Sequence, residues 1–406
     1  MDIKKQAFLN TVGNIIYLLS LWLLTVITTR FLGYDAAGTL TLAMAVGNVI
    51  STIQIFGVRG YQSSDMTFQY SSRDYVITRV LTVIAGWMLG LAICITLHYP
   101  VWISLSIMLF ILLKTSETFS DVLFGNDQRI GHLELAGYSM TARGILLIVL
   151  FCVGVIIWKS LNAALLISSG GILALSLLID LPLHNKITGK LGHLTDRGIV
   201  GILKACFPLL LATLIPAVIT AFPRVILERY YGSETLGYYG NVSTPALLLT
   251  TVVPTILIAL LPGYGKMAEE KDFRKMRTVW LQSIGGVILI TAAAMLGVWL
   301  LGKPVLAFVY TDEILPFVPY LYSVLIAMML YTITMCNNTF LVSLRRNWGL
   351  MLTTLLALLL CLAVSLPLVR AWGISGAIAA LGVPYAVQTI VQTVWILWIC
   401  KEGDQP

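Results

Sequence analysis

The sequence is dominated by apolar stretches, each long enough to form a helix that crosses a lipid bilayer. A hydrocarbon core of roughly 30 Å requires about 20 consecutive apolar residues in a helix. Segments of this length must satisfy their backbone hydrogen bonds internally, so the chain is predicted to be an all-α membrane protein. We predict twelve spans, at residues 8–29, 36–58, 76–97, 100–124, 133–158, 161–181, 200–226, 235–262, 278–301, 316–343, 348–369 and 373–400.

Composition agrees with this class. Hydrophobic residues make up 58% of the 406 residues and charged residues 11%, which is too apolar for a water-soluble globule. The net charge of +7 is spread over short loops and forms no basic face, so no nucleic-acid partner is expected. The stretch at 8–29 has no small-residue cleavage site, and we interpret it as a first span and not as a removed signal peptide.

The basic residues predict the orientation of the chain in the membrane. Loops on one side, with the termini, hold 18 of the 26 lysines and arginines. The positive-inside rule then places both termini in the cytoplasm. The opposite side holds six, namely Arg30, Lys159, Arg224, Arg229, Lys303 and Arg370.

One hairpin motif occurs twice, 199 residues apart, and each copy lies between two predicted spans. The copies read Arg30-Phe-Leu-Gly33-x-Asp35-x-x-Gly38 and Arg229-Tyr-Tyr-Gly232-x-Glu234-x-x-Gly237. The repeat predicts two six-helix bundles, at residues 1–185 and 200–406, joined by a cytoplasmic linker at 186–199. An even number of spans in each half makes the repeats parallel and related by a pseudo-two-fold axis along the membrane normal.

Charged residues inside the predicted spans are the candidate functional groups. Lys114 and Arg143 each lie about 15 Å from the cytoplasmic end of their spans at the helical rise of 1.5 Å per residue. Glu117 follows Lys114 by three residues and Asp121 follows Glu117 by four, so these three charges share one helix face. Arg224 lies near the outer end of the seventh span.

Two interpretations of these charges remain open. In the first, Glu117 and Arg143 form a structural ion pair that fixes two neighbouring helices. In the second, Lys114, Arg143 and Arg224 line a central cavity and bind the phosphates of an anionic substrate. Counting these three cations against Glu117 leaves an excess of two positive charges, which favours the second interpretation.

Two further features of the spans also have alternative interpretations. Arg30 and Arg229 end the first and seventh spans. They either stabilise the negative ends of these helix dipoles or contact substrate from the outer side. Three prolines in the seventh span either let the helix bend during transport or only kink it statically. They are Pro208, Pro216 and Pro223.

Several classes of site are not expected. The six cysteines and four histidines are scattered without metal-ligand spacing, so we predict neither a metal site nor a disulfide framework. No phosphate-binding loop for ATP is present, and no cofactor is predicted. The longest internal loops hold about 18 residues, which leaves no room for a catalytic domain. We therefore do not expect an enzyme.

The chain resembles the Wzx-type polysaccharide transporters, the O-antigen and capsule flippases. This family belongs to the MOP superfamily, which also contains the MATE drug transporters and the lipid II flippases. The resemblance extends over the whole chain and rests on the order and spacing of short motifs: Asn10-Thr-Val-Gly13-Asn14, Thr29-Arg30-Phe-Leu-Gly33, Tyr230-Tyr-Gly232-x-x-x-Leu-Gly237, Leu261-Pro262 before the charged loop from Lys266 to Lys275, and Trp372-Gly-Ile-Ser-Gly-Ala377.

The resemblance implies a flippase of the bacterial plasma membrane that works by alternating access. Its substrate would be an oligosaccharide repeat unit on undecaprenyl diphosphate, made for O-antigen, capsule or a similar polysaccharide. Candidate diphosphate contacts are Arg143, Lys114, Arg224, Arg30 and Arg229.

Energy could come from H+ or Na+ binding at Glu117 or Asp121. Membrane lipids, a polysaccharide polymerase and chain-length proteins are the further partners that this function implies. The alternative is a MATE-like H+/Na+-coupled multidrug antiporter, which would need a net acidic cavity for cationic drugs.

Overall fold

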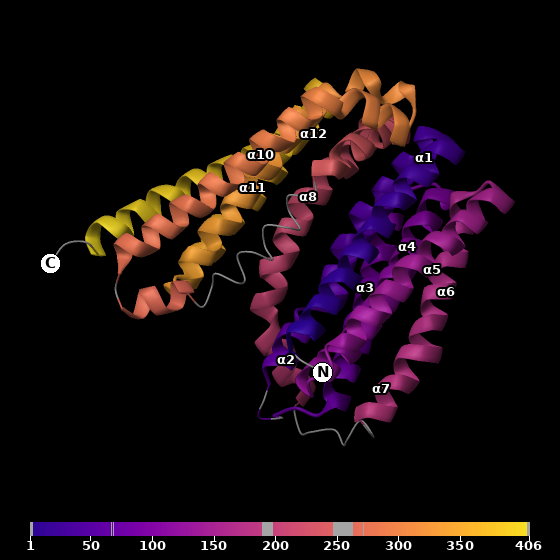
Figure 1. Cartoon of the computed structure of the whole chain (residues 1–406). Helices are drawn as coiled ribbons and strands as arrows, with labels where there is room; N and C mark the ends of the chain where they lie inside the picture. Colours follow the sequence, from indigo (N-terminus) through magenta and orange to yellow (C-terminus); the bar gives the residue numbers. More distant parts are fainter. Residues whose placement is uncertain are drawn as a thin grey trace. The chain divides into compact units, whose positions relative to one another are not determined.

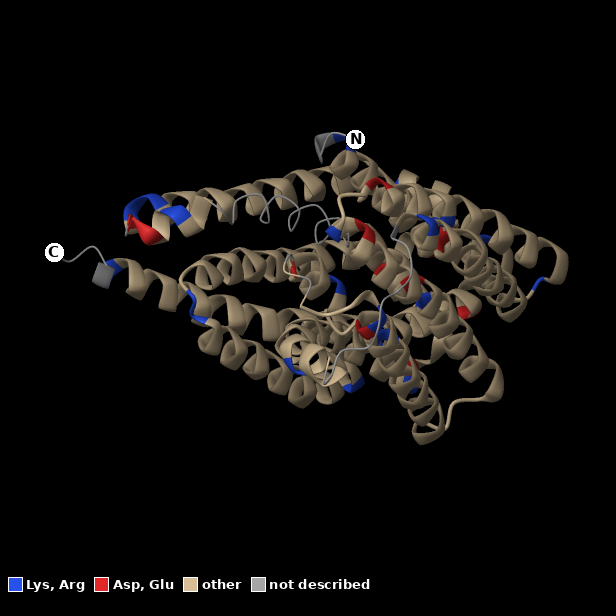
Figure 2. Cartoon of the chain, turned by 90° about the horizontal axis from the view of Figure 1, so that it is seen from below, with Lys and Arg blue, Asp and Glu red and all other residues tan. Residues whose placement is uncertain are grey.

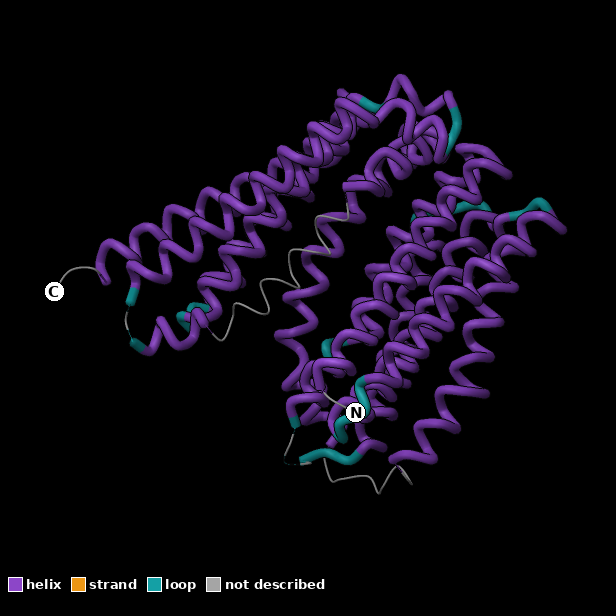
Figure 3. The backbone as a smooth tube through the Cα atoms, in the orientation of Figure 1, coloured by secondary structure: helices purple, strands orange, loops and turns teal. Residues whose placement is uncertain are grey.

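The computed structural model describes residues 3–65, 67, 69–188, 198–246, 263–270 and 272–403, and these residues form helices and short connections (Figure 1). Figure 3 shows no strand among them. Nine of the described helices are long and apolar enough to span a membrane. The predicted class, an all-α multi-pass membrane protein, is therefore confirmed.

The chain divides into two compact units, Met1–Ala217 and Val218–Pro406. The division falls inside one long helix, beyond the predicted linker at 186–199, most of which lies outside the described residues. The first part of that helix packs Ile202 and Cys206 against Val58, Tyr75 and Val122 of the first unit. These apolar contacts explain why the first unit extends past residue 200.

The first unit contains seven α-helices, a π-helical turn and the beginning of an eighth α-helix. The α-helices are α1 (Ile3–Ile55), α2 (Val58–Ser64), α3 (Ser72–Thr96), α4 (Val101–Arg129), α5 (Glu134–Trp158), α6 (Leu161–Leu175) and α7 (Leu181–Thr188). The π-helical turn η1 covers Ser176–Asp180, and α8 covers Gly198–Ser243.

The second unit begins within α8 and contains three further long helices. They are α10 (Phe273–Val309), α11 (Pro319–Ser343) and α12 (Asn347–Gly403). Its described residues also include a short helix at 263–269 and two 3₁₀ turns, η2 (Thr244–Ala246) and η3 (Asp312–Phe317). Trp280 of α10 packs beside Phe340 of α11 in the apolar core of this unit.

Three helices, α1, α8 and α12, are each interrupted by one glycine outside helical geometry. Gly33 has φ 86° and ψ 177°, and Gly232 has φ 80° and ψ 170°, so the two copies of the hairpin motif share one backbone conformation. The third break, at Gly373, has φ 55° and ψ −123°. These positive φ values are readily adopted only by glycine.

The breaks explain how nine long helices fit twelve predicted spans. The first two predicted spans lie in α1 and the last two in α12, with one break within each pair. Helix α8 contains the seventh span and the start of the eighth, whose residues 247–262 lie outside the described residues. Figure 1 shows the N-terminus and α2 at the same end of the first unit, so α1 runs out and folds back.

Close contact between α1 and α5 holds the first unit together. A Cβ atom on Gly137 would lie 2.5 Å from the backbone carbonyl group of Leu9, and one on Gly13 would overlap the Gly137 carbonyl. Glycines at such crossings let membrane helices approach backbone to backbone. This packing brings Tyr17 of α1 and Arg143 of α5 into the interior, where both are buried.

Candidate functional site

A fully buried ion pair forms the centre of the polar network in the first unit. Arg143 of α5 places Nη2 2.5 Å from Oδ2 of Asp180 in η1, and the two side chains are 0% and 5% exposed. The same carboxylate oxygen accepts hydrogen bonds from Ser120 at 2.9 Å and Ser139 at 3.0 Å. Charge-assisted hydrogen bonds of this kind are among the strongest in proteins.

The remaining guanidinium contacts join Arg143 to three helical elements. Nε donates to Ser139 Oγ at 3.2 Å and Nη1 to the Ser116 carbonyl at 3.3 Å. Nη2 also donates to Ser176 Oγ at 2.7 Å and to Ser120 Oγ. Arg143 therefore links α4, α5 and the π-helical turn, and all of its nitrogen atoms have partners.

Asp180 and Ser176 both come from the π-helical turn η1 between α6 and α7. The wide turn positions Ser176 and Asp180, four residues apart, so that both reach the same nitrogen of Arg143. Short π-helical turns are rare and are frequently found at functional sites. The local geometry of the sixth predicted span is thus adapted to hold one arginine.

A second ion pair lies nearby and is more accessible. Lys114 Nζ is 3.0 Å from a Glu117 carboxylate oxygen, and the side chains are 9% and 15% exposed. The hydroxyl of Tyr17 donates to the same glutamate. The Lys114 ammonium also lies 5.7 Å from the ring centres of Tyr17 and Phe110, within the range of cation–π attraction.

The predicted pairing of Glu117 with Arg143 is wrong, because each residue has a different partner. Asp180, the partner of Arg143, was not among the candidate residues predicted from the sequence. Its neighbours on both sides are apolar, in the run Leu177-Leu-Ile-Asp180-Leu-Pro-Leu183. A carboxylate inside an apolar run is the sequence feature that could have identified Asp180 as a candidate. With Asp180 included, the charges of the two pairs cancel, and the expected excess of two positive charges is not found in this cluster.

Asp121 lies one turn further along α4 and is held by two arginines. Its oxygens lie 3.1 Å from Arg59 Nη1 and 3.0 Å from Arg79 Nη2. Arg79 is fully buried within α3 and also donates to the Gln54 carbonyl at 2.5 Å. Arg79 is one of the 18 basic residues assigned above to the loops of the cytoplasmic side, and this assignment is wrong, because Arg79 is buried in α3, where Asp121 stabilises its charge.

The other predicted cations do not join this cluster. Arg30 belongs to the first unit and Arg229 to the second; both are exposed and each precedes the glycine break by three residues. Arg224 of the second unit is 8% exposed, with its guanidinium 5.7 Å from the ring centre of Tyr239. Figure 2 colours the ribbon blue at lysine and arginine positions and red at aspartate and glutamate positions.

The second unit contains a polar network without charges. Trp280 Nε1 donates to Asn337 Oδ1 at 2.9 Å, and Asn337 Nδ2 donates to Thr393 at 3.2 Å. Gln392 joins α11 and α12 through hydrogen bonds to Asn338 at 3.0 Å and Thr353 at 2.9 Å. Asn337 and Asn338 thus connect α10, α11 and α12 by hydrogen bonds within this unit.

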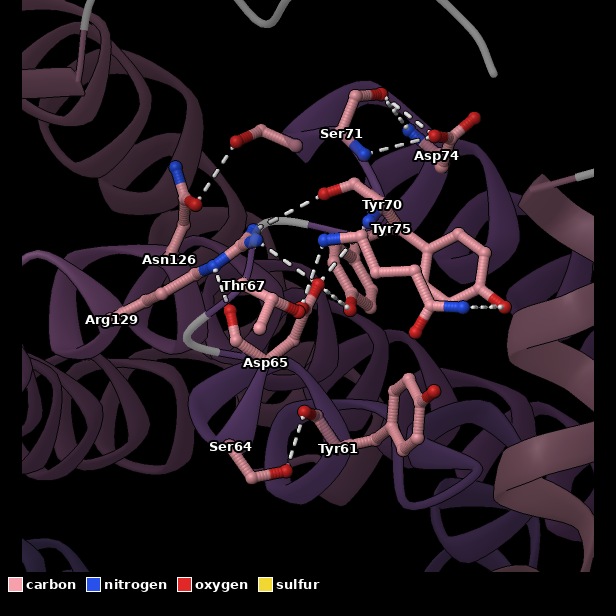
Figure 4. A network of polar contacts seen from close by, with 12 residues as sticks. Tyr61, Ser64, Asp65, Thr67, Tyr70, Ser71, Asp74, Tyr75, Asn126 and Arg129 are labelled. Atoms are coloured by element: carbon pink, nitrogen blue, oxygen red, sulfur yellow. Dashed lines mark hydrogen bonds and ion pairs between the residues drawn. The ribbon is translucent and has the colours of Figure 1, made fainter. Parts of the chain in front are cut away.

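A further network stabilises the connection from α2 to α3 (Figure 4). Asp65 accepts hydrogen bonds from the backbone N–H groups of Gln69 at 2.9 Å and Tyr70 at 3.2 Å and from the Tyr75 hydroxyl at 3.0 Å. Arg129 of α4 completes an ion pair with Asp65 at 3.0 Å. Burial acts to raise the pKa of Asp65, but these hydrogen bonds and Arg129 together hold it below the ordinary value.

No group of three histidine, cysteine, aspartate or glutamate side chains within the described ranges could hold a metal ion. All six cysteines are free, and five of them are buried. The described polar clusters therefore consist of ion pairs, hydroxyl groups and amides. Such groups are suited to binding and to helix packing.

Comparisons with known proteins connect this architecture to a family. Residues 134–319, from the start of α5 to the start of α11, match the family described as "Polysaccharide biosynthesis protein". This segment includes Arg143, Asp180 and Arg224. No curated protein sequence matches the chain.

Solved structures with the same fold cover almost the whole chain. The lipid II flippase MurJ in an inward closed conformation aligns with a TM-score of 0.70 at 12% identity, over 96% of this chain and 87% of that chain. An inward-facing multidrug resistance MATE transporter of the MOP superfamily gives 0.68 at 14% identity, over 98% and 95%. The Vibrio cholerae MATE transporter VcmN in its bent form gives 0.60 at 13% identity, over 98% and 97%.

Identities this low establish the fold alone, while the family match comes from the sequence of residues 134–319. The two findings agree with the resemblance predicted from the short motifs. The chain therefore has the same helical fold as these solved structures, and its residues 134–319 match the polysaccharide biosynthesis family.

Proposed function

We propose that the protein is a flippase for polyprenyl-diphosphate-linked oligosaccharides at the bacterial plasma membrane. The observation that carries this proposal is the match of residues 134–319 to a polysaccharide biosynthesis family within a transporter fold. The lipid II flippase among the structural neighbours supports a lipid-linked substrate. The repeat unit would serve O-antigen, capsule or a similar polysaccharide, with a polymerase and chain-length proteins as partners.

Among the candidate cations of the first unit, Lys114 is the best placed to meet a diphosphate. Its ammonium has three donors, and Glu117 accounts for one ion pair at 3.0 Å. Its side chain is 9% exposed, whereas that of Arg143 is fully buried and surrounded by partners. We therefore assign Arg143 a positioning role, in which it fixes the helices that present Lys114.

Alternating access would move the diphosphate and sugars between the two sides of the membrane. Of the two proposed coupling carboxylates, Glu117 is the better candidate for H+ or Na+. The two side chains are similarly exposed, at 15% and 18%, but Glu117 is paired with one lysine, while Asp121 is held between two arginines. A single charge crossing a potential of 100 mV yields about 2.3 kcal/mol.

The test is transbilayer movement of a fluorescent polyprenyl-diphosphate oligosaccharide in proteoliposomes. We expect Lys114→Gln to slow movement at least tenfold and Lys114→Arg to retain most of it. The double variant Lys114→Gln, Glu117→Gln leaves no unpaired charge and should be as slow as the single variant. Lys303→Gln, at an exposed lysine of the second unit, is the control. Full activity in the neutral double variant would exclude Lys114 as a diphosphate contact.

A MATE-like multidrug antiporter is the second candidate, because MATE transporters share the fold. The cancelling charges of the two ion pairs remove the electrostatic argument against it. The same proteoliposomes should be assayed for uptake of cationic dyes under imposed H+ and Na+ gradients. Dye uptake without movement of the lipid-linked oligosaccharide would replace the flippase proposal with this one.

A further inference from the structure

A groove on the first unit lies between the end of α1, the middle of α3 and the beginning of α8. Its volume is about 430 Å³, within the range of about 300–1,000 Å³ typical of ligand sites. All of its lining residues belong to the first unit, and they are Phe56, Leu81, Thr82, Ala85, Val200, Leu203, Lys204 and Phe207.

The lining is apolar except for one cation. Helix α8 contributes residues 200, 203, 204 and 207, which the helical repeat places on one face. The hydroxyl of Thr82 donates to the Gln54 carbonyl at 2.7 Å, so its proton is not free for a hydrogen bond to a ligand in the groove. Lys204 supplies the single charged group, near the end of α8 that the basic-residue pattern places in the cytoplasm.

The α1 contribution to the groove comes from a strained residue. Phe56 has φ 52° and is followed by Gly57 with φ 68°, so two consecutive residues adopt left-handed geometry between α1 and α2. For a bulky residue such as phenylalanine this conformation is an outlier. Backbone strain of this kind clusters at ligand-binding sites, where the surrounding structure maintains it.

Two close contacts fix α8 against the rest of the groove. A Cβ atom on Gly57 would lie 2.7 Å from Cβ of Leu209, and one on Gly201 would lie 2.5 Å from the Tyr70 hydroxyl. Tyr70 belongs to the Asp65 network of Figure 4, which orders the connection between α2 and α3. Helix α8 is therefore in close contact with the α1–α2 and α2–α3 connections beside the groove.

We propose that this groove binds the first isoprenoid units of a polyprenyl diphosphate, with the diphosphate on Lys204. The inference rests on the proposed flippase function and adds a docking site at the cytoplasmic side. A lipid that enters here would be held by its chain before its sugars reach Lys114. Lys204 is exposed near the beginning of α8, and lysines near helix ends in membranes can keep their ammonium at the interface while the apolar stem packs below it.

Charge and shape favour this occupant over a bulk phospholipid. The groove has one cation in an otherwise apolar lining, which matches a ligand with one apolar chain and one anionic head. Phosphate oxygens accept charge-assisted hydrogen bonds from an ammonium group, and a diphosphate carries more negative charge than a phosphodiester. Phe56 and Phe207 provide flat apolar surfaces against which a branched chain packs.

Photo-crosslinking in lipid nanodiscs tests the site. The probe is a short-chain polyprenyl diphosphate with a diazirine on its second isoprene unit, and labelled peptides are identified by mass spectrometry. We expect label on residues 81–85 and 200–207. Ala85→Trp, which fills the groove, should reduce labelling at least tenfold. Leu91→Trp, at another exposed position of α3, should leave it unchanged.

Lys204 is tested by comparing probes. Lys204→Gln should weaken binding of the diphosphate probe roughly tenfold, the equivalent of about 1.4 kcal/mol, and leave binding of the matching polyprenyl alcohol unchanged. Lys204→Arg should restore diphosphate binding. Equal loss for both probes, or displacement of the probe by a tenfold excess of phosphatidylglycerol, would overturn the assignment.

These experiments distinguish failure of the isoprenoid groove from failure of the proposed flippase function. Retained labelling in a protein that moves no lipid-linked oligosaccharide would contradict the flippase function and leave the isoprenoid groove in place. Normal movement in the Ala85→Trp variant would show that the groove is not a docking site, without affecting the flippase proposal.

Discussion

At the scale of single residues, the interior of the first unit is organised by neutral pairs. Arg143 is paired with Asp180 and Lys114 with Glu117, while Asp121 lies between Arg59 and Arg79. A buried charge that loses its partner keeps its desolvation penalty, and breaking such a pair typically costs about 3–5 kcal/mol. These side chains therefore affect stability as well as any contact with substrate.

Removal of Arg143 is expected to lower the amount of folded protein. Arg143 is fully buried, and its guanidinium group contacts α4, α5 and η1. The pair with Asp180 predicts destabilisation by about 3–5 kcal/mol, because the buried carboxylate loses its partner. Thermal unfolding of detergent-solubilised protein and its abundance in membranes give the measurement.

The matched control removes both charges. Arg143→Met combined with Asp180→Leu should be markedly more stable than Arg143→Ala, since no buried charge remains unpaired. Equal stability of the single and double variants would contradict the pairing. A transport defect in a stable double variant would add a functional role for the pair.

The Asp65 network predicts a pH-dependent contribution to stability. The hydrogen bonds and Arg129 hold the pKa of Asp65 in the folded state below the ordinary value of the unfolded state. The stabilisation is therefore fully present at a pH above the ordinary pKa, and it is lost as the pH falls through the pKa of the folded state. Asp65→Asn should therefore lower the Tm most at neutral pH. The difference from wild type should shrink below about pH 4, near the ordinary pKa of aspartate. A difference that is independent of pH down to pH 3 would contradict the pairing.

At the scale of elements, the apolar stretches predicted the helices well, but the hairpins less so. The predicted turns around residues 30–35 and 227–234 are single-glycine breaks within otherwise helical segments. The motif repeat identified both glycines because no other residue readily adopts φ near 80° with ψ near 180°. The π-helical turn η1 had no signal, since it depends on contacts with α4 and α5 that sequence spacing does not reveal.

Substitution of these glycines tests the hairpin geometry. No atom lies within 4 Å of a Cβ placed on Gly33 or Gly232, so Gly→Ala adds backbone strain without a steric clash. We expect each variant to lose about 1–3 kcal/mol of stability. Gly60→Ala has equally free space but lies in helical α2, and it should be neutral or slightly stabilising. Similar stability of all three variants would exclude strain at the breaks.

At the scale of the whole molecule, composition and span length were sufficient to predict an all-α multi-pass membrane protein. Sequence could not assign partners to buried charges. Residues 143 and 180 are 37 positions apart and belong to different helices, and no local pattern links them. The family resemblance required the order of several weak motifs together, because no one of them is specific.

The distribution of basic residues predicts the orientation of the whole chain. Green fluorescent protein fused after residue 406 should fluoresce, because it folds in the cytoplasm and not after export by the general secretory pathway. Alkaline phosphatase fused after Lys159, in a loop assigned to the opposite side, should be active. The reverse pattern would contradict the positive-inside assignment.

The single-glycine breaks also have a mechanical consequence. A flexible loop between two spans would provide slack, so that one span could shift lengthwise while its neighbour stayed in place. At Gly33 and Gly232 the helix resumes at once, and there is no spare chain to absorb such a shift. The two spans of each hairpin must therefore move together, and any force applied to one is passed directly to the other.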